Sequence, residues 1–497
     1  MNSGRRHFIQ RIAALSGGVV TSAQGWEQKK AVPCMPGMPM PGCPNDSDQK
    51  LRIDRSSTHD STITLPVVGP DVPDLDFQMD NGVKVFHLVA EPVKQMIFPG
   101  KVINLWGYSG SAPGPTIQVN QGDRVRIVVD NHLPEPTSMH WHGFEVPFEM
   151  DGAPGLSQEP IPPGGRYIYE FTLHQEGTYF YHSHMAMQEM MGMIGAFIMH
   201  PQKVYQPRID KDFVLILQEY AILPSNPTPN SMNMEFNWLT FNGKAGPAAT
   251  PLIIRQGDRV KIRLINLGMD HHPIHLHGQQ FVVTGTEAGR QPQNTWFSQN
   301  TVLVAVAQAR DIEFDAKYTG DWMIHCHLPH HMMNQMSSIV GPLTRRPGID
   351  AGVGMEEGMG MMREGAATSE GNGPSIGRGM GVGSQLEQLT TNGPMSRNQG
   401  GASMQGMQMN PGRADVSKDA GSVPGFPQDA FMEGPPMAMD AMFEKPETDG
   451  LRPGWSGFVG GMMTLLRVLP PDRYDRIMEL RTKQAARRDE TSAHEHA

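Results

Sequence analysis

Four short histidine clusters stand out in the sequence, at residues 140–142, 182–184, 272–277 and 325–331, and each contains the pattern His-x-His. On a β-strand, residues i and i+2 point to the same face, so each pattern presents two imidazoles side by side. An isolated pair is usually surface histidine, but four clusters in one chain indicate a shared metal site. The chain also holds 37 Met and 20 His, and soft sulfur with imidazole suits copper.

The fourth cluster carries a cysteine between two histidines. On a strand, Cys326 faces away from its two flanking imidazoles. A Cys thiolate, two imidazoles and a weak thioether form the trigonal site of blue copper. The nearby candidates for the other ligands are His331 and Met336, and His272 can arrive from a neighbouring strand. A single residue step therefore connects a blue copper to a histidine-rich cluster over ~10 Å of extended chain, which is a path for electrons.

An internal repeat positions these clusters. The segment QGDRV at 121–125 recurs at 256–260, and His-Trp-His-Gly recurs as His-Leu-His-Gly at the same offset. Two copies of a unit of roughly 140 residues therefore lie head to tail. Each copy is rich in short apolar and β-branched runs bounded by Gly, Pro and Asn, which is typical of a β-sandwich. We predict an all-β fold of two Greek-key sandwiches, at residues 60–200 and 205–342.

The four motifs, in this order and spacing, resemble the copper signatures of the multicopper oxidases, the superfamily of laccase and ascorbate oxidase. The resemblance covers about residues 60–342. It implies two cupredoxin-like domains with four coppers per chain, namely one type 1, one type 2 and two type 3. The type 1 ligands that it implies are His272, Cys326, His331 and Met336. The type 2 ligands would be His140 and His275, and the type 3 ligands His142, His182, His184, His277, His325 and His327.

Most members of this family have three such domains, but only 87 residues separate His184 from His272, which leaves no room for a middle domain. The chain is therefore similar to the two-domain branch. In the first repeat, the counterparts of the four type 1 ligands are Thr137, Ser183, Gln188 and Met193. Without a Cys thiolate, this repeat cannot hold blue copper, so it contributes only to the type 2 and type 3 cluster.

The ligands of that cluster divide equally between the two domains, with four histidines from each. The cluster must therefore lie between one domain of each kind. In the two-domain branch the pairing is between neighbouring chains, which close a threefold ring through a heterologous contact. The resemblance thus implies a homotrimer with trinuclear clusters between its chains.

The resemblance also implies an enzyme, an oxidase with O2 as acceptor. A reducing substrate gives one electron at a time to the type 1 copper, and the electrons pass through Cys326 and its flanking histidines. The trinuclear cluster then reduces O2 to two waters, which requires protons. Asp151 matches the acid that the family uses there, although an Asp before Gly152 is also typical of a turn. Met332 stands where some members carry another acid.

The sequence leaves two classes of reducing substrate open, namely phenols with aromatic amines and Cu(I). Laccase-like members oxidise phenols and aromatic amines, whereas the cuprous oxidases of copper tolerance oxidise Cu(I) and carry Met-rich segments. This chain has five Met within residues 185–193, Met332 and Met333 beside His331, and many Met after residue 343. Thioethers prefer Cu(I), which favours copper tolerance. Met also fills gaps in cores, which could explain the 185–193 loop.

Other functions fit less well. A copper nitrite reductase also has two cupredoxin domains, but its type 1 Cys lies in the first domain, where this chain has Ser183. A copper-sequestering protein would have no use for Cys326 between two ordered histidines. The chain has a net charge of -10 and no block of basic residues, which does not suit a nucleic-acid-binding protein. No run of ~18 apolar residues could span a bilayer.

The N-terminal end differs from the middle of the chain. Residues 1–24, with Arg5-Arg6 before a weakly apolar run, resemble a twin-arginine export signal. Such a signal implies a periplasmic or extracellular protein. Residues 25–59 form a linker in which Cys34 and Cys43 bracket three Met, as a local disulfide or as a copper clasp.

The C-terminal part also has its own composition. Residues 343–450 are Met- and Gly-rich, and we predict that they are largely disordered because they cannot bury enough apolar surface. Residues 451–486 are predicted to form short docking helices, one from Trp455 to Leu469 and one from Asp472 to Lys483, separated by Pro470-Pro471.

Overall fold

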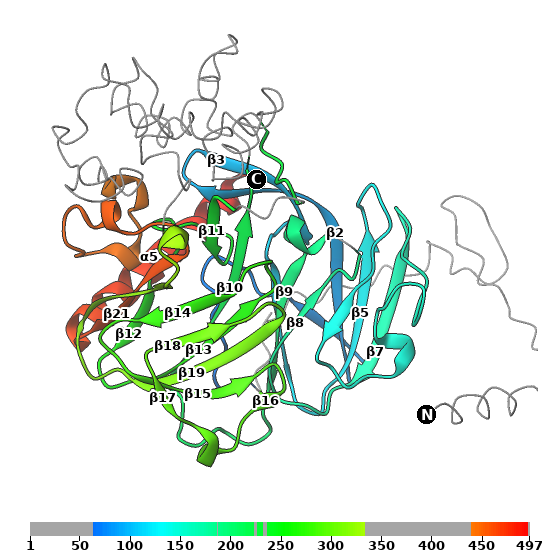
Figure 1. Ribbon diagram of the computed structural model, residues 1–497, viewed down its shortest axis with the longest axis horizontal. Coiled ribbons are helices and arrows are strands. Elements are labelled where there is room, and N and C mark those ends of the chain that lie inside the picture. Colours follow the sequence, from blue (N-terminus) through cyan, green and yellow to red (C-terminus); the bar gives the residue numbers. More distant parts are fainter. Residues whose placement is uncertain (1–62, 186, 223–225, 232–235, 333–438, 496–497) are drawn as a thin grey trace, which may run out of the picture. The chain divides into compact units, whose positions relative to one another are not determined.

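The computed structural model in Figure 1 describes residues 63–185, 187–222, 226–231, 236–332 and 439–495. The predicted export signal at 1–24, the predicted linker at 25–59 and Met336 lie outside the described residues. Most of the predicted disordered segment at 343–450 lies outside them as well. No helix of the described part is long and apolar enough to cross a membrane.

The first sandwich consists of two facing sheets. One has the order β1-β2-β5-β7 with β3 paired to β2, and its strands are Phe77–Asp80, Val83–Phe98, Arg124–Asn131, Arg166–Thr172 and Lys101–Tyr108. The other has the order β4-β9-β8-β6, formed by Gly114–Asn120, Ile194–His200, Gly177–His182 and His140–His142. The parallel pairs β2·β5 and β4·β9 arise because the chain crosses between sheets, as in a Greek key. Buried aromatic and aliphatic side chains around Trp141 form the core.

The second sandwich repeats this plan. One sheet has the order β11-β10-β13-β19-β15-β16 with β17 paired to β15, formed by Trp238–Phe241, Lys211–Tyr220, Arg259–Asn266, Gln308–Asp315, Phe281–Thr286, Gly289–Arg290 and Ser298–Gln299. The other has the order β12-β21-β20-β14-β18, formed by Leu252–Arg255, Met463–Leu469, Gly320–Cys326, His272–Leu276 and Thr301–Val304. These strands confirm the predicted all-β fold of two Greek-key sandwiches.

Helical structure is confined to short turns and one α-helix in the described part. The turns are η1 Phe148–Met150, η2 Glu189–Met191, η3 Gln293–Thr295, η4 Pro329–Met332, η9 Asp440–Phe443, η10 Pro446–Thr448 and η11 Trp455–Phe458. The helix is α5, Pro471–Glu495. It begins at a proline, which suits the first helical position because that N–H has no partner in a helix. Its side chains Tyr474 and Ile477 pack on Ile253 and Leu469.

The structure corrects the prediction of a helix from Trp455 to Leu469. Residues 463–469 are instead strand β21, which lies between β12 and β20 in the sheet of the second sandwich. All seven of its residues are buried and five of them are apolar, so the segment lacks the apolar–polar alternation that would distinguish a strand from a helix. The second sandwich therefore includes a strand well beyond residue 342.

A buried arginine fixes this strand. Arg467 is 1% exposed, and its Nε donates to Asp321 Oδ1 at 2.7 Å. Its Nη1 donates to the carbonyl oxygens of Glu447 and Asp449 at 2.7 and 3.0 Å. A buried guanidinium is tolerated only where its charge and donors are matched, as they are here. Through these contacts, Arg467 of β21 connects the segment at residues 447–449 to the start of β20.

The two sandwiches pack against each other within this folded unit. Apolar side chains from β8 and β9 meet those from β10 and β13 in one buried cluster that includes Phe180, Ile198, Val214 and Ile265. Beside it, Thr178 donates to Asp311 Oδ1 at 2.6 Å, and Asp311 pairs with buried Lys261 at 2.7 Å. The packing fixes the position of β8, which carries His182, relative to the second sandwich.

If β21 is a central strand of the second sandwich, truncating its buried Leu466 should destabilise the fold. Leu466 is fully buried. We expect Leu466→Ala to lower the free energy of unfolding by about 2–5 kcal/mol, because it leaves a cavity between two sheets. Urea denaturation of the full-length chain measures this. Phe458→Ala, at a side chain that is 63% exposed, is the control and should change stability by less than about 0.5 kcal/mol. Equal effects of the two variants would contradict the placement of β21.

Candidate metal centres

A first group of donor atoms converges in the second sandwich. His272 begins β14, Cys326 ends β20 and His331 lies in η4. His272 Nδ1 and His331 Nδ1 are 3.2 Å apart, and the Cys326 Sγ lies 3.7 and 3.5 Å from them. All three residues are at most 1% exposed. The structure thus brings together three of the four residues that the sequence predicts for a type 1 site, and the fourth, Met336, lies outside the described residues.

A buried carboxylate fixes the tautomer of His272. Glu219 is fully buried, and its Oε1 accepts hydrogen bonds from the backbone N–H groups of Met269 and Asp270. Its Oε2 lies 2.8 Å from His272 Nε2. This carboxylate oxygen accepts a hydrogen bond from the Nε2–H of His272. Nδ1 then carries the lone pair, on the side of the Cys326 sulfur. This orientation suits metal ligation by Nδ1.

A second carboxylate lies beside His331. Asp270 Oδ2 is 3.4 Å from His331 Nε2, and this contact lowers the pKa of Asp270. Burial raises the pKa of the Cys326 thiol to about 12, and the charges of Glu219 and Asp270 add to the effect. A thiol in this environment stays protonated unless a cation offsets its charge. The donor set therefore fits a thiophilic metal cation.

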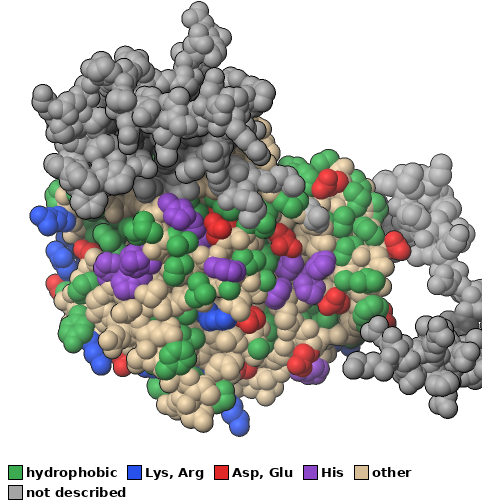
Figure 2. All heavy atoms as spheres, viewed as in Figure 1, with side chains coloured by type: hydrophobic (Ala, Val, Ile, Leu, Met, Phe, Trp, Pro, Cys, Tyr) green, Lys and Arg blue, Asp and Glu red, His purple; other side chains and the backbone are tan. Residues whose placement is uncertain are grey.

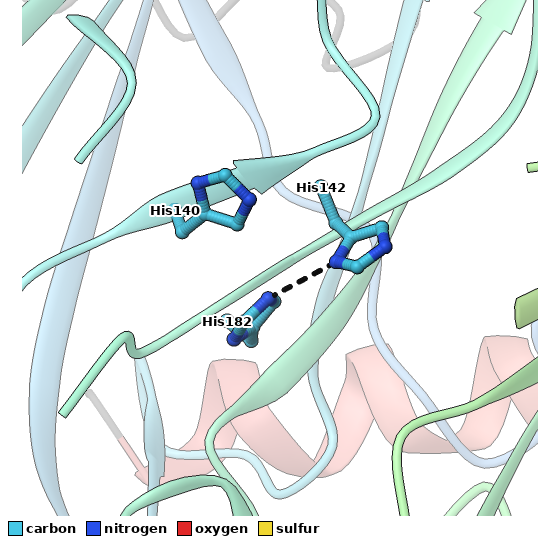
Figure 3. A group of neighbouring side chains, drawn as sticks. All are labelled: His140, His142 and His182. Atoms are coloured by element: carbon cyan, nitrogen blue, oxygen red, sulfur yellow. Dashed lines mark hydrogen bonds between the residues drawn. The ribbon is translucent and has the colours of Figure 1, made fainter. Parts of the chain in front are cut away.

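A second group consists of four histidines in the first sandwich. The pairing of β6 with β8 places His140 opposite His182, and His142 Nδ1 lies 3.4 Å from His182 Nε2 (Figure 3). The His184 ring is 5.2 Å from that of His140. Burial, then the neighbouring imidazoles, lowers the pKa of His142 to about 4. The ring is therefore neutral near pH 7, with a lone pair free for a metal.

A third group of four histidines has the same arrangement in the second sandwich. The pairing of β14 with β20 places His275 opposite His325, and His277 Nε2 lies 3.0 Å from His325 Nε2. The His327 ring is 5.3 Å from that of His275. Burial and neighbouring imidazoles lower the pKa of His277. An open pocket of about 680 Å³ lies beside His275 and His277.

The two four-histidine groups are separate within one chain. All eight residues are described, and ring contacts join them only within each group. His184 and His327, one from each group, are exposed. Figure 2 likewise shows histidine side chains in separate patches on one face of the molecule. Each group thus reaches the surface at one of its histidines.

Asp151 lies beside the four-histidine group of the first sandwich. Its backbone oxygen accepts a hydrogen bond from His140 Nδ1 at 2.7 Å, and its carboxylate is 3.6 Å from the same nitrogen. The next residue, Gly152, has φ +87°, and a Cβ there would lie 1.7 Å from the Met139 oxygen. The turn is therefore tight, as a structural role of Asp151 requires, and it also brings the carboxylate to the histidines.

The sequence of both sandwiches matches one known family. Residues 93–204 match one model of the multicopper oxidase family, and residues 221–341 match another. The chain belongs to the multicopper oxidase superfamily. Membership implies copper as the metal, and a thiol with two imidazoles whose donor atoms all lie within 4.8 Å of one another is a donor set that copper accepts.

Individual relatives match over parts of the chain. Laccase-1 of Cryptococcus neoformans is 47% identical over 299 residues, which is 48% of this chain and 47% of that protein. A copper resistance protein A homolog of Pseudomonas syringae is 41% identical over 113 residues, 23% of this chain and 19% of that protein. The solved structure of the multicopper oxidase mgLAC has a TM-score of 0.47 at 30% identity, over 50% of this chain and 81% of that one. The chain thus spans less than half the length of both curated relatives.

In the first sandwich, a polar network occupies the place that corresponds to the Cys326 group. Thr137 Oγ1 and Ser183 Oγ donate to Gln188 Oε1 at 2.8 and 2.6 Å. Gln188 Nε2 donates to Glu135 Oε1 and to the Pro136 oxygen, each at 2.9 Å. Every polar atom of the glutamine is used, so hydrogen bonds replace a metal in this repeat.

Sequence reasoning missed several parts of these centres. Glu219 and Asp270 belong to no motif, and Glu219 lies far from His272 along the chain. Glu219 lies on β10, in a different sheet from β14, so its contact with His272 could be found only from the fold. The sequence signal for β21 is the mostly apolar segment before Pro470, but such a segment is also compatible with a helix.

The polar network predicts a stability effect that is independent of copper. We expect Gln188→Ala to lower the free energy of unfolding by about 1–3 kcal/mol, because it removes the acceptor that the buried hydroxyls of Thr137 and Ser183 share. Denaturant unfolding of metal-free protein measures the loss. Exposed Gln202→Ala should be neutral. A Gln188→Ala variant as stable as the parent would show that the network does not stabilise the first sandwich.

Proposed function

We propose that the chain is a copper-dependent oxidase that couples one-electron oxidation of a reducing substrate to the four-electron reduction of O2 to water. The observation that supports this most directly is the position of Cys326. Its sulfur lies with His272 and His331 on one side of β20, while the residues on either side of it, His325 and His327, belong to the four-histidine group. One strand therefore carries ligands for two kinds of centre.

The ligand sets follow from these groups. A type 1 copper would be held by His272, Cys326 and His331 with a thioether, for which the sequence predicts Met336. The type 2 copper would take His140 and His275, and the type 3 pair would take His142, His182, His184, His277, His325 and His327, giving four coppers per chain. When bound, copper supplies the one-electron chemistry and the site of O2 reduction.

The chain's own residues provide orientation, an electron path and protons. Glu219 and Asp270 hold the two imidazoles of the Cys326 group by their outer nitrogens. The covalent step from Cys326 to its neighbours links the centres without a solvent gap. The Asp151 carboxylate, which is 38% exposed, can take protons from water and release them beside His140.

We propose Cu(I) as the reducing substrate and copper tolerance as the role. Met323 of β20 and Met332 of η4 pack against a buried cluster that includes Met463, and Met332 directly follows His331 of the Cys326 group. Thioethers bind Cu(I) in preference to Cu(II). The similarity to copper resistance protein A supports this proposal. Laccase-like oxidation of phenols or aromatic amines is the second candidate, supported by the similarity to Laccase-1. The proposed location is periplasmic or extracellular, after export by the twin-arginine-type signal at 1–24.

The electron path through Cys326 can be tested by removing its sulfur. Cys326→Ser should abolish the blue absorption and reduce O2 uptake to background with both Cu(I) and a phenol, because the hydroxyl is not a charge-transfer ligand. Most copper should stay bound at the histidine groups, as measured by metal analysis. Cys34→Ser is the matched control and should keep the blue band. Normal turnover by Cys326→Ser would refute the proposal, and the ratio of parent rates with the two donors ranks the substrates.

We also propose that the active form is a homotrimer, in which the half-site of one chain meets the complementary half-site of the next. The separation of the two four-histidine groups within one chain supports this, because each group alone offers only half of the ligands. His275 and His277 line an open pocket, so this group can be reached from outside the chain. A heterologous contact that closes after three copies brings every pair of halves together.

Complementation between chains tests this assembly. One variant carries His140→Ala and His182→Ala, and the other carries His275→Ala and His325→Ala, so each is inactive alone. If the clusters lie between chains, co-expression restores about a quarter of the clusters, since a random ring pairs an intact first half with an intact second half at that frequency. Copper analysis, O2 uptake and light scattering report the outcome. No recovery, or a copper-loaded active monomer of the parent, would contradict the trimer.

A further inference from the structure

The second sandwich places β21 where the first sandwich has β9. The two sheets that carry the histidines share one strand order, β4-β9-β8-β6 in the first and β12-β21-β20-β14 in the second. In each sheet, the strand that ends at the second or fourth histidine cluster, β8 or β20, lies between the last strand of the sandwich and the strand that carries the preceding cluster. The final strand follows directly in the first sandwich, whereas residues 327–462 precede it in the second.

The correspondence extends to single hydrogen bonds. Ile194 is opposite His182, and Met463 is opposite His325. One residue further, the Ser183 N–H donates to the Met193 oxygen at 3.2 Å, and the Cys326 N–H donates to the Met462 oxygen at 3.0 Å. Met462 therefore holds in the second sandwich the position of Met193 in the first.

A second pair of bonds fixes the same residues from the other side. The Met193 N–H donates to the Gln188 oxygen at 3.4 Å, and the Met462 N–H donates to the His331 oxygen at 2.8 Å. The backbone of Met462 is thus held between Cys326 and His331. Two of the three residues that form the Cys326 group are its direct hydrogen-bond partners.

The side chain of Met462 lies on the face of the sulfur. Residues opposite each other in an antiparallel pair project to the same face, with Cβ atoms about 4.5–5.5 Å apart. Cys326 and Met462 are both fully buried and belong to one buried cluster. The unbranched methionine side chain has three rotatable bonds, so its sulfur can adapt to a centre at that distance.

We propose that Met462, in place of the Met336 predicted from the sequence, supplies the axial thioether of the copper centre formed by His272, Cys326 and His331. This rests on the proposed function, since it requires copper in that group. A thioether there is a weak, long axial ligand that tunes the reduction potential of the copper. Met462 directly precedes β21 and lies after the Met-rich segment, so the chain that includes this segment leaves the centre after His331 and returns to it at Met462.

The test uses the full-length copper-loaded protein and three substitutions of similar volume. Met462→Leu should keep the blue band but raise the reduction potential, because it removes a donor to Cu(II). A tenfold change in the preference for Cu(II) over Cu(I) corresponds to about 59 mV. Met462→Gln should shift the potential in the opposite direction and change the electron paramagnetic resonance spectrum, because an amide oxygen is a harder donor. Met336→Leu should leave the potential unchanged.

The outcomes separate the possible failures. Opposite shifts for Leu and Gln mark a ligand, since loss of packing alone would not change sign with the donor. Met199→Leu, at a fully buried methionine of the first sandwich, is the matched control for core packing. A potential that moves with Met336→Leu and stays constant in both Met462 variants overturns the inference. A parent protein without a blue band would instead refute the proposed function.

Discussion

The register between β14 and β20 is the constraint on which both metal-binding groups of the second sandwich depend. Ile274 is opposite Cys326 and His275 is opposite His325. Because side chains alternate along a strand, this register directs the sulfur into the sandwich and the flanking imidazoles out of it. A slip by one residue would exchange the two faces and destroy both groups together. The same pairing of β6 with β8 in the first sandwich orients His140 and His182.

Electrostatics around the Cys326 group favour a bound cation. The fully buried Glu219 carboxylate faces His272, and Asp270 faces His331, so two acidic groups lie behind the two imidazoles. A buried negative charge is costly unless it is paired or hydrogen-bonded. Backbone N–H groups and a neutral imidazole satisfy part of that requirement for Glu219. A copper ion at the sulfur would supply the remaining positive charge and would allow the buried thiol to ionise.

The sequence predicts the parts of this structure that depend on local pattern. The His-x-His clusters and the repeat are periodic features, so they predict the sandwiches and bring together His272, Cys326 and His331 correctly. The strand β21 was mistaken for a helix because a short buried apolar run has no distinguishing period. Glu219 was missed because its contact with His272 depends on how β10 and β14 meet in space. Met336, which is predicted from its spacing to Cys326, lies outside the described residues and stays a prediction.

The two sandwiches share one backbone arrangement next to the residue at the Cys326 position. In both, the residue that precedes the last strand bonds through its backbone to the residue at the Cys326 position and to the one at the His331 position. The first sandwich makes these bonds with Ser183 and Gln188, side chains that form a polar network in place of a donor set. The backbone frame is therefore independent of the metal, and a few side chains decide whether it holds copper. Since the frame is defined by strand pairing, the long segment before β21 separates Met462 from Cys326 along the sequence, while the backbone hydrogen bond keeps the two residues adjacent in space.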